Sequence, residues 1–335
     1  MTEFKPHPLE VIPAGEVADI ERVTEMQIAI MKQHQDPSKR GQHPKQQALL
    51  RGVFEVSGNV PETMRVGIFS KPQKFDALVR MSTGLLPKDS DPQAHGCAIK
   101  LLDVPGSPTG TQDFIMLDGS TFFIRDVADY VSFFNATSKG CPAEFFASHR
   151  REFGLSSAFS VVVASHLDRQ YWAELPIAMG DGAGRLTLIP DVSNTSGRPA
   201  ASTPDGLKDA LVDFFVTQRK AATFTFGVQP YIDERTTPIE DATSVWGTQF
   251  EAVATLTIEP QDFTAPGQYE FCENLSYTPW HCHPDHQPLG GIQRCRKRVY
   301  EESQKLRHSL NNAEDREPTS ADLARLGPVK DRAAA

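Results

Sequence analysis

Short segments in which apolar and polar residues alternate recur along the chain, and they constrain its fold more than any other feature. Alternation with a period of two is typical of a β-strand that buries one face. Clusters rich in Pro, Gly and Asp, such as 84–92 and 105–110, separate these segments as turns separate antiparallel strands. The strands predicted in this way span residues 52–56, 77–82, 97–101, 114–124, 184–189, 222–231 and 248–259.

Helical patterns interrupt the strands. Residues 20–31 carry apolar side chains at helical spacing, and a longer helical stretch is predicted from Val127 to about Leu175, with Asp126 placed to cap its start. A further helix is expected over residues 207–220. Strands followed by helices and then by strands indicate an α+β fold, an antiparallel β-barrel core with flanking helices.

The length of the chain favours one large domain. A chain of 335 residues can bury a large core, and we predict a single domain over residues 1–310, in which 1–35 form an N-terminal arm and helix. Residues 311–335 are charged and rich in alanine, with few side chains that could pack. We therefore expect them to form a flexible tail.

A pattern near the C-terminus places a phenol between two guanidinium groups. If residues 291–308 are helical, Arg296, Tyr300 and Arg307 lie at roughly 0°, 40° and 20° around the helix axis. A neighbouring cation favours the phenolate and lowers a tyrosine pKa that is normally about 10. A phenolate is a ligand for ferric iron and one of the axial ligands of haem, and a second arginine could pair with a haem carboxylate. The same segment can also be read as a basic amphipathic helix whose charges are solvated.

Four ordered segments carry a family resemblance: Arg40–Lys45, Val79–Gly84, Phe122–Asp126 and Arg296–Arg307. Together they resemble the haem catalase superfamily, specifically its short catalase-like branch of catalase-related peroxidases. The likeness runs from about residue 35 to 310, with little motif in the middle third. It implies that residues 1–310 are a single catalase-like haem domain that holds haem b and its iron.

The resemblance implies roles on both sides of the haem. Tyr300 matches the tyrosine that binds the iron, which makes it the expected metal ligand. His43 matches the distal histidine, which can take a proton from a peroxide and return it to the departing oxygen. Ser82 matches a serine that hydrogen-bonds this histidine and fixes its tautomer.

Other positions match residues that contact the cofactor in the family. Three arginines match those that pair with the haem propionates, and three aromatic residues match the ring against the haem and the apolar lining of the distal pocket. Taken alone, the aromatic residues read as ordinary core residues. The arginines are Arg40, Arg80 and Arg307, and the aromatic residues are Tyr130, Phe122 and Phe123.

The chain departs from the family beside the distal histidine. Where catalases carry an asparagine, this chain has Leu117 and Asp118. An ionised aspartate can only accept hydrogen bonds, and near His43 it would hold the imidazole protonated. High catalase activity is therefore in doubt. Asp118 is read either as an altered acid–base partner or as a turn residue of the Asp118-Gly119 pair.

The resemblance implies a haem-dependent peroxidase or catalase-like oxidoreductase. It would reduce hydrogen peroxide or organic hydroperoxides through a ferryl intermediate, with a small reductant supplying electrons. An alternative is isomerase or dehydratase chemistry on fatty-acid hydroperoxides, as in allene oxide synthases. A third reading is a non-catalytic protein that binds or senses haem. The sequence leaves open whether the chain forms a homo-oligomer.

Composition bounds the partners and the compartment. The formal net charge of -9 argues against a nucleic-acid partner. Five cysteines without CxxC spacing fit reduced thiols in the cytoplasm better than a disulfide framework. The start of the chain, Met1–Pro6, lacks the apolar core of a signal peptide, and no apolar run approaches the ~20 residues that cross a bilayer. We therefore expect a cytoplasmic protein without a membrane span.

The segment 281–286 concentrates three histidines, a cysteine and an aspartate. Such a cluster suggests a transition-metal site, although closed zinc sites usually draw ligand pairs from separate segments. The segment also resembles the loop that leads into the proximal helix of short catalase-like proteins. We favour the structural loop over the metal site.

Overall fold

An antiparallel barrel forms the centre of the computed structural model, which describes residues 5–34, 36 and 38–331. Residues 1–4, part of the start where we found no signal-peptide pattern, lie outside the described residues. The strand order is β5-β4-β3-β2-β1-β9-β8-β7-β6, and an added β5–β7 pairing closes a ring of eight described strands with β6 outside it. The strands are β1 (Lys45–Val56), β2 (Lys74–Thr83), β3 (His95–Leu101), β4 (Gln112–Leu117), β5 (Tyr171–Trp172), β6 (Ile177–Met179), β7 (Gly182–Pro190), β8 (Ala222–Pro230) and β9 (Glu251–Ile258).

Along each strand every second side chain points inward, and these side chains fill the interior of the barrel. Phe54, Phe114 and Phe226 come from three different strands and meet in its interior, with ring centroids 4.8 to 6.0 Å apart. Phe69 packs against this group from the connection between β1 and β2. Full burial of one such ring contributes roughly 1.5–3 kcal/mol. Because the period-two pattern puts apolar side chains on one face of each strand, closing the sheet into a barrel buries all of them together.

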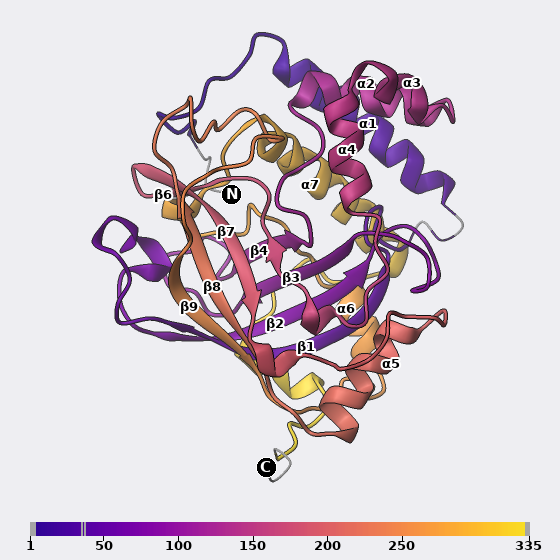
Figure 1. Cartoon of the computed structure of the whole chain (residues 1–335), viewed down its shortest axis with the longest axis vertical. Coiled ribbons are helices and arrows are strands. Elements are labelled where there is room, and N and C mark those ends of the chain that lie inside the picture. Colours follow the sequence, from indigo (N-terminus) through magenta and orange to yellow (C-terminus); the bar gives the residue numbers. More distant parts are fainter. Residues whose placement is uncertain (1–4, 35, 37, 332–335) are drawn as a thin grey trace.

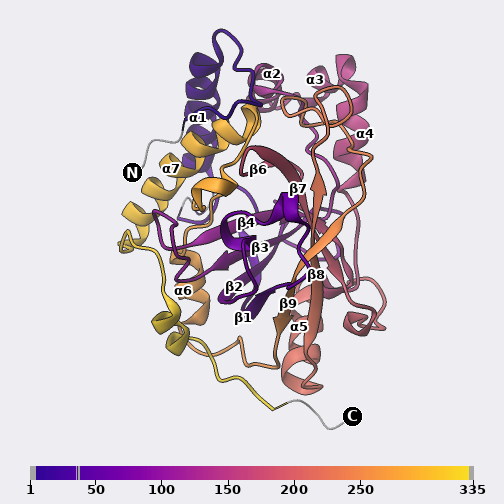
Figure 2. The ribbon, with the colours of Figure 1, turned by 90° about the vertical axis from the view of Figure 1, so that its left-hand side faces the viewer.

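Helices cover the outer face of the barrel. Figures 1 and 2 show α1 to α4 and most of α7 towards one end of the molecule, while α5 and the C-terminal segment lie towards the other. Within the described residues, no helix is long and apolar enough to cross a membrane. The α-helices are α1 (Glu16–Gln33), α2 (Val127–Ser138), α3 (Pro142–Ser148), α4 (Arg150–Ala158), α5 (Gly206–Val212, continued by a π-helix over Asp213–Thr217), α6 (Gln268–Asn274) and α7 (Gly291–Asn311). Short 3-10 turns are Glu62–Met64, Gly67–Phe69, His166–Asp168, Val192–Asn194, Pro284–His286 and Ser320–Arg325.

The α+β class and the antiparallel barrel with flanking helices are confirmed, whereas two boundaries predicted from the sequence are wrong. The Asp126 carboxylate accepts a hydrogen bond from the Asp129 amide and starts α2, as expected. The helical stretch does not continue to Leu175: it breaks before Pro142, resumes as α3 and α4, and ends at Ala158. α2 ends at Ser138, just before Gly140, whose φ of 73° lies in the left-handed region, and Pro142 stands in the first turn of α3, where no amide donor is needed. The chain beyond residue 160 enters the barrel as β5.

The strand predicted over residues 114–124 ends early, at Leu117. A Cβ at Gly119 would lie 2.0 Å from a ring carbon of Phe159, so only a glycine fits where α4 approaches the chain. Residues 119–126 therefore leave the sheet and cross to α2. This crossing carries Phe122 and Phe123 out of the barrel wall.

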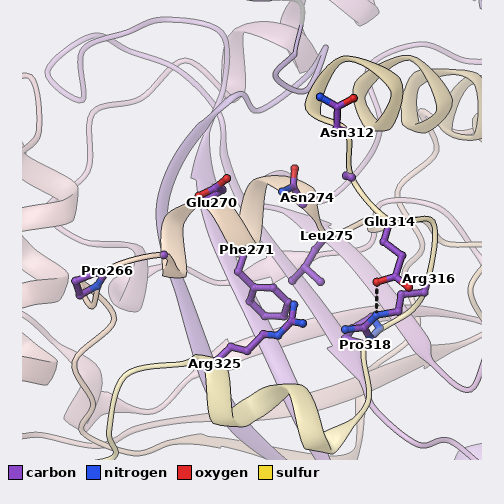
Figure 3. Close-up of a pocket in the computed structure, with 12 residues that line it drawn as sticks. Pro266, Glu270, Phe271, Asn274, Leu275, Asn312, Glu314, Arg316, Pro318 and Arg325 are labelled. Carbon is purple, nitrogen blue, oxygen red and sulfur yellow. Dashed lines mark hydrogen bonds and ion pairs between the residues drawn. The ribbon is translucent and has the colours of Figure 1, made fainter.

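The C-terminal strap, residues 312–331, differs from the flexible tail that the composition suggested. Leu323 and Leu326 are buried in a cluster with Leu49, Leu78 and residues of α6. Figure 3 shows the strap crossing near α6, with Arg325 beside the Phe271 ring and Glu314 paired with Arg316. The composition was misleading because two leucines at the right places are enough to dock a polar segment on an apolar patch.

A buried ionic cluster also ties the strap to the barrel. Lys100 and Asp113 on neighbouring strands are fully buried and 2.7 Å apart, and Glu317 of the strap gives the lysine a second carboxylate partner. His281 contacts both carboxylates. The strap thus adds a second carboxylate to the Lys100–Asp113 pair, and Asp113 and Glu317 together raise the pKa of His281 against its burial.

Candidate active site

A cavity of about 570 Å³ lies between the outer face of β2, β3 and β4 and the helices α1, α2 and α7. Most of the residues singled out in the sequence meet here, although they come from five separate segments. The lining includes His43, Ser82, Arg40, Arg80, Phe122, Phe123, Tyr130, Arg296, Tyr300 and Arg307. Asp118 is not among the lining residues.

The strand alternation decides which side chains face this cavity. Val79 and Met81 of β2 point into the barrel core, so Arg80 and Ser82 point outward. Gly96 of β3 is paired with Ser82 across the sheet and also lines the cavity. The barrel wall therefore presents polar groups at its outer surface without opening the interior.

His43 lies over this wall, immediately before β1. Its backbone has a φ of 51°, in the left-handed region, and Arg80 Nη2 donates a hydrogen bond to its carbonyl oxygen at 2.8 Å. A Cβ at Gly96 would lie 3.1 Å from His43 Nδ1 and 3.0 Å from Ser82 Oγ. The absence of a side chain at Gly96 thus leaves room for the imidazole.

The hydrogen bond expected between Ser82 and His43 is not formed at His43 Nδ1, which has no hydrogen-bond partner in the described residues. Burial, and next the positive charge of Arg80, lower the pKa of His43 to about 4. Asp118 opposes this shift but is outweighed. The ring is therefore neutral at neutral pH, contrary to the protonated state that a neighbouring aspartate would have produced.

The opposite wall is α7, which begins and ends as the sequence predicted to within a few residues. Arg296, Tyr300 and Arg307 all line the cavity from this helix. Arg294 points away and pairs with Glu10, Glu16 and Glu240, which ties the helix to the N-terminal segment and α1. The alternative reading, a basic amphipathic helix whose charges are all solvated, is therefore wrong for the face of α7 that lines the cavity.

One end of the cavity gathers three guanidinium groups. Arg40 and Arg80 approach the Glu273 carboxylate at 3.2 and 3.9 Å, and Arg307 donates to the Glu273 carbonyl oxygen. Arg40 and Arg307 also donate to the carbonyl of Leu275. Within the described residues, Glu273 is the one carboxylate that pairs with them.

This end carries an excess of positive charge. Burial, and next repulsion from Arg40, lower the pKa of Arg80 to about 10 and that of Arg307 to about 9. Guanidinium groups stay charged in proteins, so the shifts mark an electrostatic cost rather than a loss of charge. An occupant with two negative charges would balance it.

Aromatic rings fill the middle of the cavity lining. Phe122 and Tyr130 meet edge to face with centroids 5.8 Å apart, and the guanidinium of Arg296 lies 5.2 Å from the Phe122 ring centre. Burial raises the pKa of Tyr130, so its phenol stays protonated. Phe122 and Tyr130 pack against other apolar residues and also line the cavity, so they are both core residues and cavity-lining residues.

Asp118 fits neither of the two roles considered for it. Its carboxylate accepts hydrogen bonds from the backbone amide and ring Nδ1 of His95, at 2.9 and 2.8 Å, and Arg169 approaches it at 3.3 Å. Its backbone amide donates to the His95 carbonyl and so extends the β3–β4 pairing. Asp118 is a buried partner of His95, not of His43, and it is not a turn residue.

The sequence analysis did not single out two carboxylates of this site. Glu174 lines the cavity from the residue pair that follows β5, and Glu273 of α6 pairs with two of the arginines that line it. Neither stands in a motif, and Glu174 was placed within a predicted helix. Only the tertiary structure brings them to these positions.

The histidines of segment 281–286 diverge to separate partners. His281 joins the Lys100 cluster, His283 lies beside Asp285, and His286 is buried where its Nε2 accepts from the Ile68 amide. Within the described residues, no group of three or more His, Cys, Asp or Glu side chains is arranged to hold a metal ion. The segment acts as a packed loop before α7.

Comparison with known proteins places the fold. No protein-family model and no curated protein sequence matches the chain. Solved structures do: a bacterial catalase has a TM-score of 0.64 at 14% identity, covering 100% of this chain and 70% of that one. A fungal catalase has a TM-score of 0.63 at 15% identity, covering 92% and 65%, and catalase A from Saccharomyces cerevisiae has 0.64 at 15%, covering 92% and 68%. The chain therefore has a catalase-like fold.

Proposed function

We propose that this protein is a haem-dependent peroxidase of the short catalase-like type. The observation that carries the proposal is a single cavity with a histidine on one wall, a tyrosine on the facing helix and three arginines at one end. A cavity of this size suits a small-molecule or cofactor ligand. The catalase-like fold supports the same assignment.

The residues present fit haem b. Its two propionates would supply the negative charges that Arg40, Arg80 and Arg307 lack, and its apolar faces suit the aromatic lining. Tyr300 would bind the iron, and Arg296 lies one turn away on the same face of α7. Four buried cavity atoms without partners in the described residues, His43 Nδ1, Arg80 Nε, Glu174 Oε1 and Gln27 Nε2, also indicate a polar-edged occupant. When bound, haem would supply the iron redox chemistry that the side chains lack.

The chain's own residues would manage protons and water. Neutral His43 can accept the proton of a peroxide O–H group and return it to the departing oxygen. Arg80 holds the backbone of His43, and Gly96 leaves space for the ring. Phe122, Phe123 and Tyr130 would keep bulk water away from this transfer.

The cavity wall near β2 suggests organic hydroperoxides as substrates, with a small organic reductant. Leu85 and Leu86 follow β2, are 58% and 43% exposed, and line the cavity together with Phe159. An apolar mouth of this kind favours a substrate with an apolar tail. It equally suits the second candidate, a fatty-acid hydroperoxide isomerase or dehydratase, which would rearrange substrate without consuming reductant. Analysis of products with and without a phenolic reductant separates the two.

A cytoplasmic location is a further part of the proposal. All five cysteines are free thiols, which supports a reducing compartment. Four of them are buried and one, Cys141, is exposed.

Tyr300→Phe, His43→Ala and a control test the proposal. The purified protein is loaded with hemin, and its absorption spectrum and peroxide-dependent oxidation of a phenol are measured. We expect Tyr300→Phe to change the spectrum and His43→Ala to keep the spectrum while losing oxidation by about 100- to 10,000-fold. Tyr269→Phe, at a 48% exposed tyrosine outside the cavity, should behave as the unmodified protein. Protein that binds no hemin, or an unchanged spectrum in Tyr300→Phe, contradicts the proposal. Hemin binding without turnover in the unmodified protein would favour the sensing role.

A further inference from the structure

Glu174 is a buried carboxyl group at the cavity that the proposed function leaves without a role. The residue is 2% exposed, and its backbone φ of 60° lies in the left-handed region, which is unfavourable for a non-glycine residue. Its Oε1 has no hydrogen-bond partner among the described residues. Both features cost free energy, and packing alone gives no reason to keep a carboxyl group here.

The nearest charge to this carboxyl group belongs to Arg296. Glu174 Oε2 lies 3.6 Å from Arg296 Nη2, and the cavity side of α7 carries Arg296 and Tyr300 one turn apart. Arg296 is also held against the Phe122 ring. Glu174 and Phe122 thus both contact the guanidinium, Glu174 from the residues after β5 and Phe122 from the crossing between β4 and α2.

The titratable and charged groups that face Glu174 come from four parts of the chain. Burial raises the pKa of Glu174 to about 8; Arg296 of α7 and Arg185 of β7 act to lower it, and Asp118, which follows β4, acts to raise it. The fourth group is the phenol of Tyr130 on α2, whose own pKa is raised in part by Glu174. The carboxyl group is therefore protonated at neutral pH, and it can orient a guanidinium without neutralising it.

We propose that Glu174 is the positioning residue for Arg296: its buried carboxyl group fixes the guanidinium in the cavity, one helical turn from Tyr300. The inference rests on the proposed function, because there Tyr300 is the residue that would bind the iron. A neutral carboxyl group can hold the guanidinium through its carbonyl oxygen and leave the charge of Arg296 uncompensated, whereas an ionised Glu174 would pair with that charge.

Spectroscopy of the hemin-loaded protein tests this role without relying on turnover. Glu174→Gln keeps the size of the side chain and is neutral at every pH. We expect the unmodified protein to show a spectral transition with a midpoint near pH 8, and Glu174→Gln to keep the neutral-pH spectrum without that transition. Glu174→Ala should lower hemin affinity by about 10- to 100-fold, as loss of a group that orients a metal-ligand neighbour does, and Gln should rescue it. Glu240→Gln, which alters a partner of Arg294 on the other face of α7, is the matched control and should leave spectrum and transition unchanged.

The outcomes separate this inference from the proposed function. If the unmodified protein binds no hemin, the proposed function fails; the inference is then judged on the apoprotein from the infrared C=O band of a buried carboxylic acid. Loss of that band in Glu174→Gln supports the inference that Glu174 is a neutral carboxylic acid in the cavity. An identical band in both proteins overturns the inference. If hemin binds but Glu174→Gln keeps the transition, or Glu174→Ala keeps full affinity in folded protein, the inference is overturned while the function stands.

Discussion

The buried acid at Glu174 makes the stability of the apoprotein depend on pH in a way that one substitution removes. The pKa of Glu174 is raised from its ordinary 4.5 to about 8, mainly by burial. At about 1.36 kcal/mol per pKa unit, this corresponds to about 5 kcal/mol, and water entry into the cavity reduces it. Because the folded state binds the proton more tightly than the unfolded state does, the contribution is fully present below pH 4.5 and is lost as the pH rises through 8.

Urea unfolding of the apoprotein and of Glu174→Gln, measured from pH 5 to pH 9 by circular dichroism, checks this value. Glutamine does not titrate, so the free energy of unfolding of the unmodified protein should fall relative to the variant by several kcal/mol, about 5 at most, across this range. Glu251→Gln, at an exposed glutamate of β9, should follow the unmodified protein at every pH. A constant difference between Glu174→Gln and the unmodified protein from pH 5 to 9 would show that Glu174 is not a buried acid, and the reasoning would fail.

Three further predictions concern other parts of the chain. Gly96→Ala should displace His43 and Ser82, lowering peroxide turnover of the hemin-loaded protein by about 100-fold with a folded circular dichroism spectrum, since the added Cβ would lie 3.1 Å from His43 Nδ1. Lys100→Met should lower the free energy of unfolding by about 3–5 kcal/mol in urea titrations, because it strands the buried Asp113 and the Glu317 carboxylate without their cation. Leu323→Ala should cost about 2–3 kcal/mol and make the C-terminal strap sensitive to limited proteolysis, whereas an unchanged cleavage pattern would mean that Leu323 does not hold the strap.

Much of the fold and of the cavity lining could be read from short-range patterns. Alternation revealed the long strands, because one face of each is buried in the barrel, and helical spacing revealed α1 and α7. The spacing of Arg296, Tyr300 and Arg307 placed them on one helix face, and they do share the cavity. These features need only local geometry, which the chain encodes over a few residues.

Other features could not be read from local pattern. The strap was mistaken for a tail because its docking depends on Leu49 and Leu78, far away in the sequence. One of the two readings of Asp118 made it an acid–base partner beside His43, yet the β3–β4 register brings it to His95. Each error concerns a partner that is distant along the chain.

The sequence by itself determined the alternating strands, the helix faces and the chemical groups available for a cavity. Tertiary structure alone decided which charges became neighbours: it gathered three arginines around Glu273, lowered the pKa of His43 and left Glu174 buried beside Arg296. The physical reason is that burial and charge proximity act through space, so the ionisation of a side chain depends on barrel closure and not on its neighbours along the chain.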